Sequence, residues 1–220
     1  HEAAFYPSNT SSVIAATSSR KPQPDTLMIS MFDYVNDKVI AQYLMMSNEQ
    51  TNGYKAQGLR FVDKRHVLAG LTTQVVNGYK ETGNCKKMDR GFIVNKKTHA
   101  ENRVILMRLD FSVDDIASGK AEPVSSASFS IIGVLHVGVG SFDGLDYRDG
   151  LAMVADQLND KTLFFKVDPA ADEPLKLAFQ RHGYIMPHGV AFSRHRRDHM
   201  AVTSYGMNSV IVQPVPASSK

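Results

Sequence analysis

The segment Pro187-His188-Gly189-Val190-Ala191-Phe192 decides the fold, because its pattern of a polar residue, a glycine, an apolar residue and an aromatic recurs in the chain. Two further copies are Gln57-Gly58-Leu59-Arg60-Phe61 and Asp143-Gly144-Leu145-Asp146-Tyr147. A fourth copy, without the glycine, opens the chain as His1-Glu2-Ala3-Ala4-Phe5. Internal repeats of this kind predict a fold assembled from similar supersecondary units.

Each copy is followed by apolar runs with period-2 alternation and many β-branched or aromatic residues, which is typical of β-strands. We expect second strands at 13–16, 67–70, 151–155 and 200–203. Third strands are expected at 26–32, 103–109, 162–167 and 209–215, and fourth strands at 39–45, 124–131 and 175–179. Only residues 113–118 have a helical pattern. The sequence therefore predicts an all-β chain of four-stranded antiparallel units.

The spacing of the repeats indicates a β-propeller. Gly144 and Gly189 are 45 residues apart, which suits one four-stranded blade. Gly58 and Gly144 are 86 residues apart, so the stretch between them contains either a degenerate blade or a long insertion. We favour a loop insertion at about residues 75–101. Residues 1–220 are expected to form one propeller domain, either a small closed propeller or part of a larger one.

The repeat resembles a known family. Pro187-His188-Gly189-Val190-Ala191-Phe192-Ser193, followed by Met200-Ala201-Val202-Thr203-Ser204-Tyr205-Gly206 and Asn208-Ser209-Val210, is similar to the YVTN repeat of lactonase-like β-propellers, a WD40-like architecture. The resemblance covers about three quarters of the chain and excludes the insertion. It implies the fold but leaves the chemistry open, because this repeat occurs in enzymes and in binding proteins alike.

Polar residues at the starts of the first strands are the candidate site. Blade symmetry brings such positions together around a central channel, and here they are His1, Glu2, Gln57, Asp143 and His188. Imidazole and carboxylate groups bind divalent cations, so a divalent metal is one candidate cofactor. The same groups could supply a general base for lactone or ester hydrolysis. The simpler interpretation is structural, because polar groups at strand starts often bond the neighbouring blade.

Composition excludes several classes of protein. The 220 residues are 43% hydrophobic and 21% charged, as expected of a chain that can form a packed core. No stretch has the roughly 18–20 apolar residues of a membrane span. A net charge of +3 predicts no nucleic-acid partner, and a single cysteine, Cys85, excludes a disulfide between two cysteines of the chain.

Three other motifs have plain structural interpretations. Residues 138–144 resemble a phosphate-binding glycine loop, but no helical pattern follows, so we expect a linker between blades. His195 and His199 are four residues apart in a predicted β-turn, where they would not share a face. The cluster Arg194, Arg196 and Arg197 is expected to be exposed, with an acidic partner as the alternative.

Two functions follow from these observations. The first is a binding or scaffold propeller that recognises a protein partner or a small-molecule ligand through its top face or the 75–101 insertion. The alternative is a lactonase-like or metal-dependent hydrolase that uses the polar ring. A quinone-dependent propeller dehydrogenase is less favoured, because the chain has no tryptophan to supply a protein-derived quinone.

Overall fold

A computed structural model describes residues 3–7, 13–20, 27–46, 55–72, 101–124, 129–140 and 142–216. Within these ranges the chain forms four antiparallel sheets, which we call sheets A to D. Sheet A contains β1 (Ala3–Pro7), β2 (Val13–Arg20), β3 (Leu27–Asp33) and β4 (Lys38–Met46). Sheet B contains β5 (Lys55–Phe61), β6 (His66–Thr72), β7 (Glu101–Leu109) and β8 (Phe129–Val139). Sheet C contains β9 (Phe142–Arg148), β10 (Leu151–Asp156), β11 (Lys161–Val167) and β12 (Leu175–His182). Sheet D contains β13 (Pro187–Phe192), β14 (His199–Ser204) and β15 (Ser209–Pro214), and the helix α1 (Val113–Ala117) follows β7.

The prediction of antiparallel sheets in an all-β chain is confirmed, with one strand misplaced. The fourth strand of sheet B begins at Phe129, not at Val124. Val124 instead forms an isolated parallel bridge with Ala41, and its N–H donates to the Ile40 carbonyl of sheet A at 2.9 Å. Almost all of the expected insertion lies outside the described residues, because Glu101 already begins β7.

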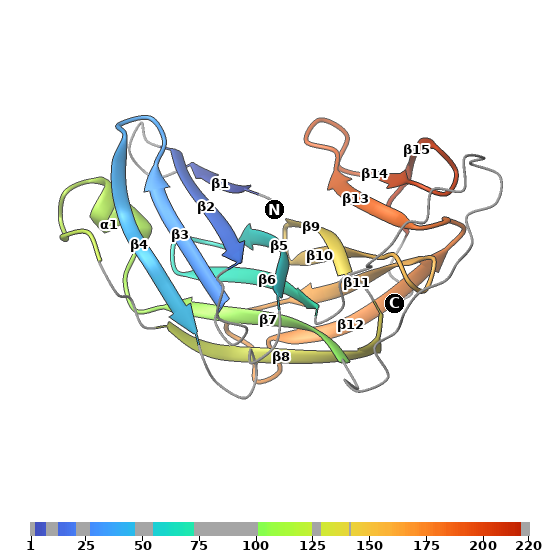
Figure 1. The fold of residues 1–220 in the computed structure, drawn as a ribbon, viewed down its shortest axis with the longest axis horizontal. Coiled ribbons are helices and arrows are strands. Elements are labelled where there is room, and N and C mark those ends of the chain that lie inside the picture. Colours follow the sequence, from blue (N-terminus) through green and yellow to red (C-terminus); the bar gives the residue numbers. More distant parts are fainter. Residues whose placement is uncertain are drawn as a thin grey trace.

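The four sheets follow one another in an arc (Figure 1), with sheets B and C between sheets A and D. One hydrophobic core lies at each junction. The first joins sheets A and B with α1, the second joins sheets B and C, and the third joins sheets C and D. The innermost strands β5, β9 and β13 pack side by side, and β1 packs on β5. Stacked sheets of this kind cover both faces of each inner sheet.

The repeated glycine allows the innermost strands to approach closely. A Cβ atom added at Gly58 would lie 2.4 Å from the Leu145 Cβ, and one added at Gly144 would lie 2.7 Å from the His188 carbonyl oxygen. No real side chain tolerates these separations, so both positions require glycine for space. Between β5 and β9, Gly58 lies against Leu145 and Arg60 bonds Asp146. Between β9 and β13, Gly144 lies against His188 and Asp146 bonds Phe192. Residue numbers rise together along both strands of each pair, so β5, β9 and β13 run in the same direction and begin on the same side of the arc.

The aromatic residue that ends each repeat packs against the preceding sheet. Phe61 and Phe192 are buried in this way, and Tyr147 is partly buried. Phe5, the equivalent residue of sheet A, is 56% exposed, because no sheet among the described residues precedes it. The repeat therefore gives sheet A an apolar face that the described part of the chain leaves uncovered.

A polar chain also joins the three innermost strands. The Arg60 Nε of β5 donates to Asp146 Oδ1 of β9 at 3.0 Å. The other carboxylate oxygen of Asp146 accepts the backbone N–H of Phe192 in β13 at 2.7 Å. Both charged side chains are mostly buried. Asp146 therefore links sheets B, C and D at one level.

The turns between first and second strands use two kinds of local chemistry. Asp149 and Gly150 both have positive φ, +49° and +81°, which is the backbone of a two-residue type I′ hairpin. In the β5–β6 turn, Asp63 Oδ1 accepts the backbone N–H groups of Arg65 at 2.7 Å and His66 at 2.9 Å. The His66 Nδ1 lies 2.8 Å from Asp63 Oδ2. Asp63 therefore fixes its turn from within.

We predict that the Asp63 charge stabilises the fold only above acidic pH. Burial raises the pKa of Asp63, but the Arg65 N–H, the His66 ring and the His66 N–H together hold it below the model-peptide value of 3.8. A carboxyl with a lowered folded-state pKa contributes stability above its unfolded pKa and loses that contribution as the pH falls through the folded pKa. Asp63→Asn should therefore lower the free energy of unfolding by less than about 1 kcal/mol at pH 7, because solvent screens this partly exposed group. The difference should vanish at a pH low enough to protonate Asp63 in both the folded and the unfolded protein. Urea unfolding of both proteins between pH 2 and pH 7 measures this, and a constant difference would contradict it.

Candidate functional site

The second residues of β9 and β13 bring a carboxylate and an imidazole into contact. His188 Nε2 lies 3.0 Å from Asp143 Oδ2. The Gln157 Nε2, from the turn after β10, donates to the same carboxylate oxygen at 2.8 Å. The His188 side chain is 42% exposed and that of Asp143 is 23% exposed. The pair therefore joins sheets C and D and remains open to solvent.

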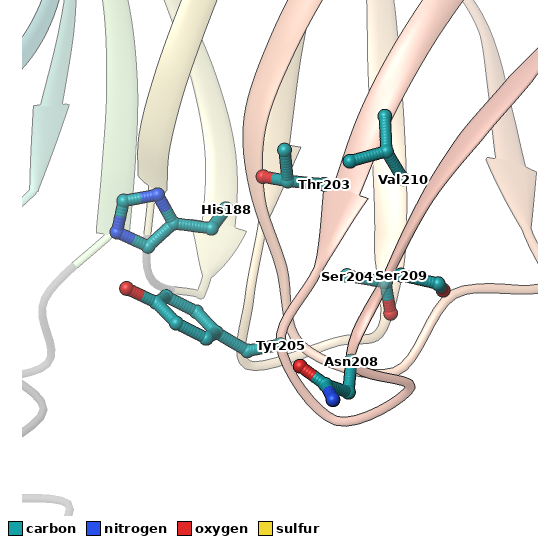
Figure 2. Close-up of a pocket in the computed structure, with 7 residues that line it drawn as sticks. All are labelled: His188, Thr203, Ser204, Tyr205, Asn208, Ser209 and Val210. Atoms are coloured by element: carbon teal, nitrogen blue, oxygen red, sulfur yellow. The ribbon is translucent and has the colours of Figure 1, made fainter.

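A tyrosine completes this group from the neighbouring turn. The Tyr205 ring lies edge-on to the His188 ring, with centroids 4.7 Å apart and planes at 89°. Figure 2 shows the Tyr205 ring beside the His188 ring, among the residues that line a pocket. The pocket has a volume of about 490 Å³ and is lined by His188, Thr203, Ser204, Tyr205, Asn208, Ser209 and Val210. This volume lies within the range of pockets that hold small organic ligands or a side chain of a partner.

The wall of the pocket is held by hydrogen bonds between two loops. The Ser204 hydroxyl donates to the Ile185 carbonyl at 2.6 Å and accepts the Ile185 N–H at 3.1 Å. The Tyr205 N–H donates to the Met186 carbonyl at 3.0 Å. The Met186 N–H donates to Asp160 Oδ1 of sheet C at 2.8 Å. These bonds fix the backbone position of Tyr205 beside His188.

An exposed apolar border adjoins the pocket. Ile185 is 40% exposed, Tyr205 54% and Met207 45%, and all three come from the two loops described above. Gly206 lies so close to Ile185 that an added Cβ would be 2.2 Å from the Ile185 Cγ2. Large apolar side chains held in solvent by a fixed backbone are typical of interaction sites.

The sequence-predicted site residues have different outcomes. Asp143 and His188 are in contact, whereas His1 and Glu2 lie outside the described residues. Gln57 occupies the equivalent position on β5, one strand from Asp143, and is partly buried. Gln57 bonds neither Asp143 nor His188 among the described residues. The binding or catalytic role of these five residues therefore stays a prediction.

The described residues offer little to a metal ion. They contain no group of three or more histidine, cysteine, aspartate or glutamate side chains that could hold one. Asp143 and His188 alone supply one carboxylate and one imidazole. No helix in this part of the chain is long and apolar enough to cross a membrane.

The remaining motifs have simple positions. Gly140 lies in the short connection between β8 and β9, with no helix after it. His195 is exposed in the β13–β14 turn, whereas His199 begins β14 and is partly buried. Arg194, Arg196 and Arg197 are exposed in the same turn. Cys85 lies outside the described residues.

Sequence reasoning missed the turns that carry Gln157 and Tyr205. Residues 33–38 and 156–161 share the pattern Asp-x-x-Asn-Asp-Lys. In both, the asparagine amide donates to the first aspartate, at 2.8 Å and 2.7 Å, and the second aspartate has a positive φ near 50°. Asparagine and aspartate favour such turns, so this pattern is a usable signal for the turn that carries Gln157, but the turn that carries Tyr205 lacks it.

Comparisons with known proteins show the fold alone. No protein-family model matches the chain, and no curated protein matches its sequence. The hydrazine synthase of Kuenenia stuttgartiensis is 9% identical with a TM-score of 0.56, over 92% of this chain and 55% of that one. Sqt1 of Chaetomium thermophilum, bound to the N-terminus of the ribosomal protein L10, is 9% identical with a TM-score of 0.51, over 92% and 42%. A chain of the COPII outer coat vertex on membranes is 12% identical with a TM-score of 0.52, over 99% and 44%.

These similarities support a propeller-like arrangement of the antiparallel sheets. The chain spans about half the length of the solved chains that it matches. At such low sequence identity, the activities and partners of those proteins are not evidence about this chain.

Proposed function

We propose that this chain is a β-propeller binding domain of the YVTN, lactonase-like type. It recognises a protein partner or a small-molecule ligand on the side of the arc where the innermost strands β5, β9 and β13 begin, and we call this side the top face. The observation that carries this proposal is the Asp143–His188 pair beside the pocket and Tyr205. Residues 1–220 would form one domain of this propeller, and the 75–101 insertion would add a second contact region.

The chemistry of the top face suits recognition of a side chain or small ligand. Tyr205 and Ile185 present apolar surface to solvent, and buried apolar anchors supply most of the affinity at interfaces. His188, Asn208 and Ser209 line the adjacent pocket and supply hydrogen-bonding groups that orient a ligand. An apolar anchor beside a few convergent polar groups is the usual composition of a binding site.

The same pair supports one alternative, a lactonase-like or esterase-type hydrolase. An imidazole held by a carboxylate is a common arrangement of a general base, and here the separation is 3.0 Å. The exposure of His188 would allow water and a substrate to reach the ring. A metal-dependent version would require ligands besides Asp143 and His188.

Tyr205→Ala and His188→Ala should weaken retention of a specific partner by about tenfold or more, because each removes a contact at the centre of the site. Affinity capture on the full chain measures this, with Tyr34→Ala as the matched control. Tyr34 is also exposed, at 68%, but lies in the β3–β4 turn of sheet A. Equal retention by all four proteins would contradict the top face as the binding site.

Hydrolysis of a lactone or ester panel by the same proteins separates the two functions. The hydrolase alternative expects turnover by the wild type that falls as the imidazole is protonated and is lost in His188→Ala. The binding proposal expects the wild type and the Tyr34→Ala control to turn over no faster than His188→Ala.

A further inference from the structure

The side of the arc opposite the top face carries a cluster of exposed lysine and arginine side chains. Because β5, β9 and β13 run in the same direction, the three turns that follow them lie on the same side of the arc, and we call these three turns together the turn face. These turns contain the exposed side chains Lys64, Arg65, Arg194, Arg196 and Arg197. Within the described part of the chain, neither Lys64, Arg65, Arg194 nor Arg196 forms a salt bridge.

The carboxylates of the turn face are engaged locally. Asp63 accepts two backbone N–H groups of its own turn and contacts the His66 ring. Asp198 Oδ1 lies 2.8 Å from His199 Nδ1. Asp149 Oδ2 lies 3.9 Å from Arg197 NH1, a long contact between exposed groups that contributes little. On these three turns, five exposed lysine and arginine side chains therefore stand against three carboxylates that each have a local partner. The adjoining loops after β7 and β11 also carry exposed carboxylates, Asp110, Asp168 and Asp172, so the excess of positive charge is confined to the three turns.

The arginine-rich turn has a fixed backbone that does not depend on its three exposed arginines. The Ser193 N–H donates to the His199 carbonyl at 3.0 Å, and the His199 N–H donates to the Arg196 carbonyl at 2.9 Å. The Ser193 hydroxyl accepts the Arg196 N–H at 3.0 Å. Three arginine side chains are therefore presented from one ordered turn.

Arg148, at the end of β9, supports this turn from the neighbouring sheet. Its NH1 donates to the Ser193 carbonyl at 2.7 Å, and its NH2 donates to the Arg197 carbonyl. Its guanidinium also lies 4.7 Å from the centre of the Phe192 ring. Arg148 is only partly exposed, so the side chain that supports the turn is not one of the exposed arginines.

We propose that the turn face binds an acidic polypeptide segment. Guanidinium groups pair with carboxylates through two parallel hydrogen bonds, and a preordered turn lowers the entropy cost of forming them. No exposed large apolar side chain lies on these three turns, which disfavours insertion into a membrane and stacking on nucleic-acid bases. The net charge of +3 is low for a protein that binds a phosphate backbone. This surface is distinct from the top face and does not depend on the function proposed there.

The test uses a fluorescein-labelled twelve-residue peptide of alternating glutamate and serine, with binding to the full chain followed by fluorescence anisotropy. The triple variant Arg194→Gln, Arg196→Gln and Arg197→Gln should weaken binding by about tenfold or more. The matched control, Lys120→Gln, Lys166→Gln and Lys176→Gln, removes the same charge from exposed positions outside the three turns and should change binding by less than about twofold. Binding to the wild type should also weaken when the salt concentration rises from about 50 mM to about 200 mM, because the screening length becomes shorter.

A second measurement locates the peptide. Carbodiimide coupling forms an amide between a peptide carboxylate and a nearby lysine, so mass spectrometry should find Lys64 coupled in preference to Lys120, Lys166 and Lys176. The proposal is overturned if the peptide does not bind the wild type, or if both triple variants lose equal affinity. It is also overturned if a twelve-nucleotide single-stranded DNA or phosphatidylserine vesicles bind more tightly than the peptide.

Discussion

Gly144→Ala should lower the free energy of unfolding by about 3 kcal/mol, at the upper end of the range for overpacking. The new methyl group would lie 2.7 Å from the His188 carbonyl oxygen and 3.0 Å from the Gly189 Cα. Both neighbours are backbone atoms of β13, so relief requires sheets C and D to move apart. Urea unfolding monitored by circular dichroism measures the loss.

Gly70→Ala is the matched control for this prediction. A Cβ at Gly70 in β6 would lie 3.6 Å from Leu145 Cδ1 and 3.8 Å from Phe142 Cδ2, which are ordinary contacts. The alanine should be neutral or stabilising by a few tenths of a kcal/mol, since it lowers the entropy of the unfolded chain. Equal losses for the two variants would show that close approach of the innermost strands is not what requires Gly144.

Asp146→Ala should destabilise the protein by about 3 kcal/mol, because it removes the carboxylate that accepts hydrogen bonds from two mostly buried donors. These donors are the Arg60 guanidinium and the Phe192 backbone N–H, at 3.0 Å and 2.7 Å from the carboxylate. Asp146→Asn keeps an acceptor oxygen but removes the charge, and should lose about half as much. Thermal and urea unfolding of both variants measure the difference.

The control for Asp146 is an exposed ion pair of the same sheet. Glu173 and Lys176 are 3.8 Å apart and about 70% exposed, so Glu173→Ala should change stability by less than about 0.5 kcal/mol. A double-mutant cycle between Arg60 and Asp146 then isolates their coupling. A coupling energy near zero would mean that the Phe192 N–H alone accounts for the loss.

The repeated segment around Gly189 was sufficient to predict the antiparallel sheets, because glycine, apolar and aromatic positions recur wherever a strand must pack on its neighbour. It also predicted that Asp143 and His188 lie near each other, since both precede the repeat glycine. The role of Arg60 and Asp146 was not predicted, because the equivalent position holds a different residue in each repeat and so gives no recurring pattern. Each makes a different bond to the next sheet.

Residues remote from the repeat explain the rest. Tyr205 reaches His188 only because Ser204 is bonded to Ile185 in another loop, and Gln157 reaches Asp143 from the turn after β10. Such contacts depend on the path of two loops in space, which local patterns do not specify. Val124 was misassigned to β8 for the same reason, because its partner Ile40 is in a different sheet.

The order of the sheets along the arc has a consequence for how the molecule opens. Among the described residues, sheets B and C are each packed on two faces, whereas sheets A and D are each packed on one. Among these four sheets, detaching sheet A or sheet D would therefore expose one of the three cores, while opening sheet B or sheet C would expose two. Structures built as linear stacks lose cooperativity from their ends inward. The pocket beside Tyr205 lies on sheet D, so an occupant that contacts both His188 and Asp143 would also hold sheet D against sheet C.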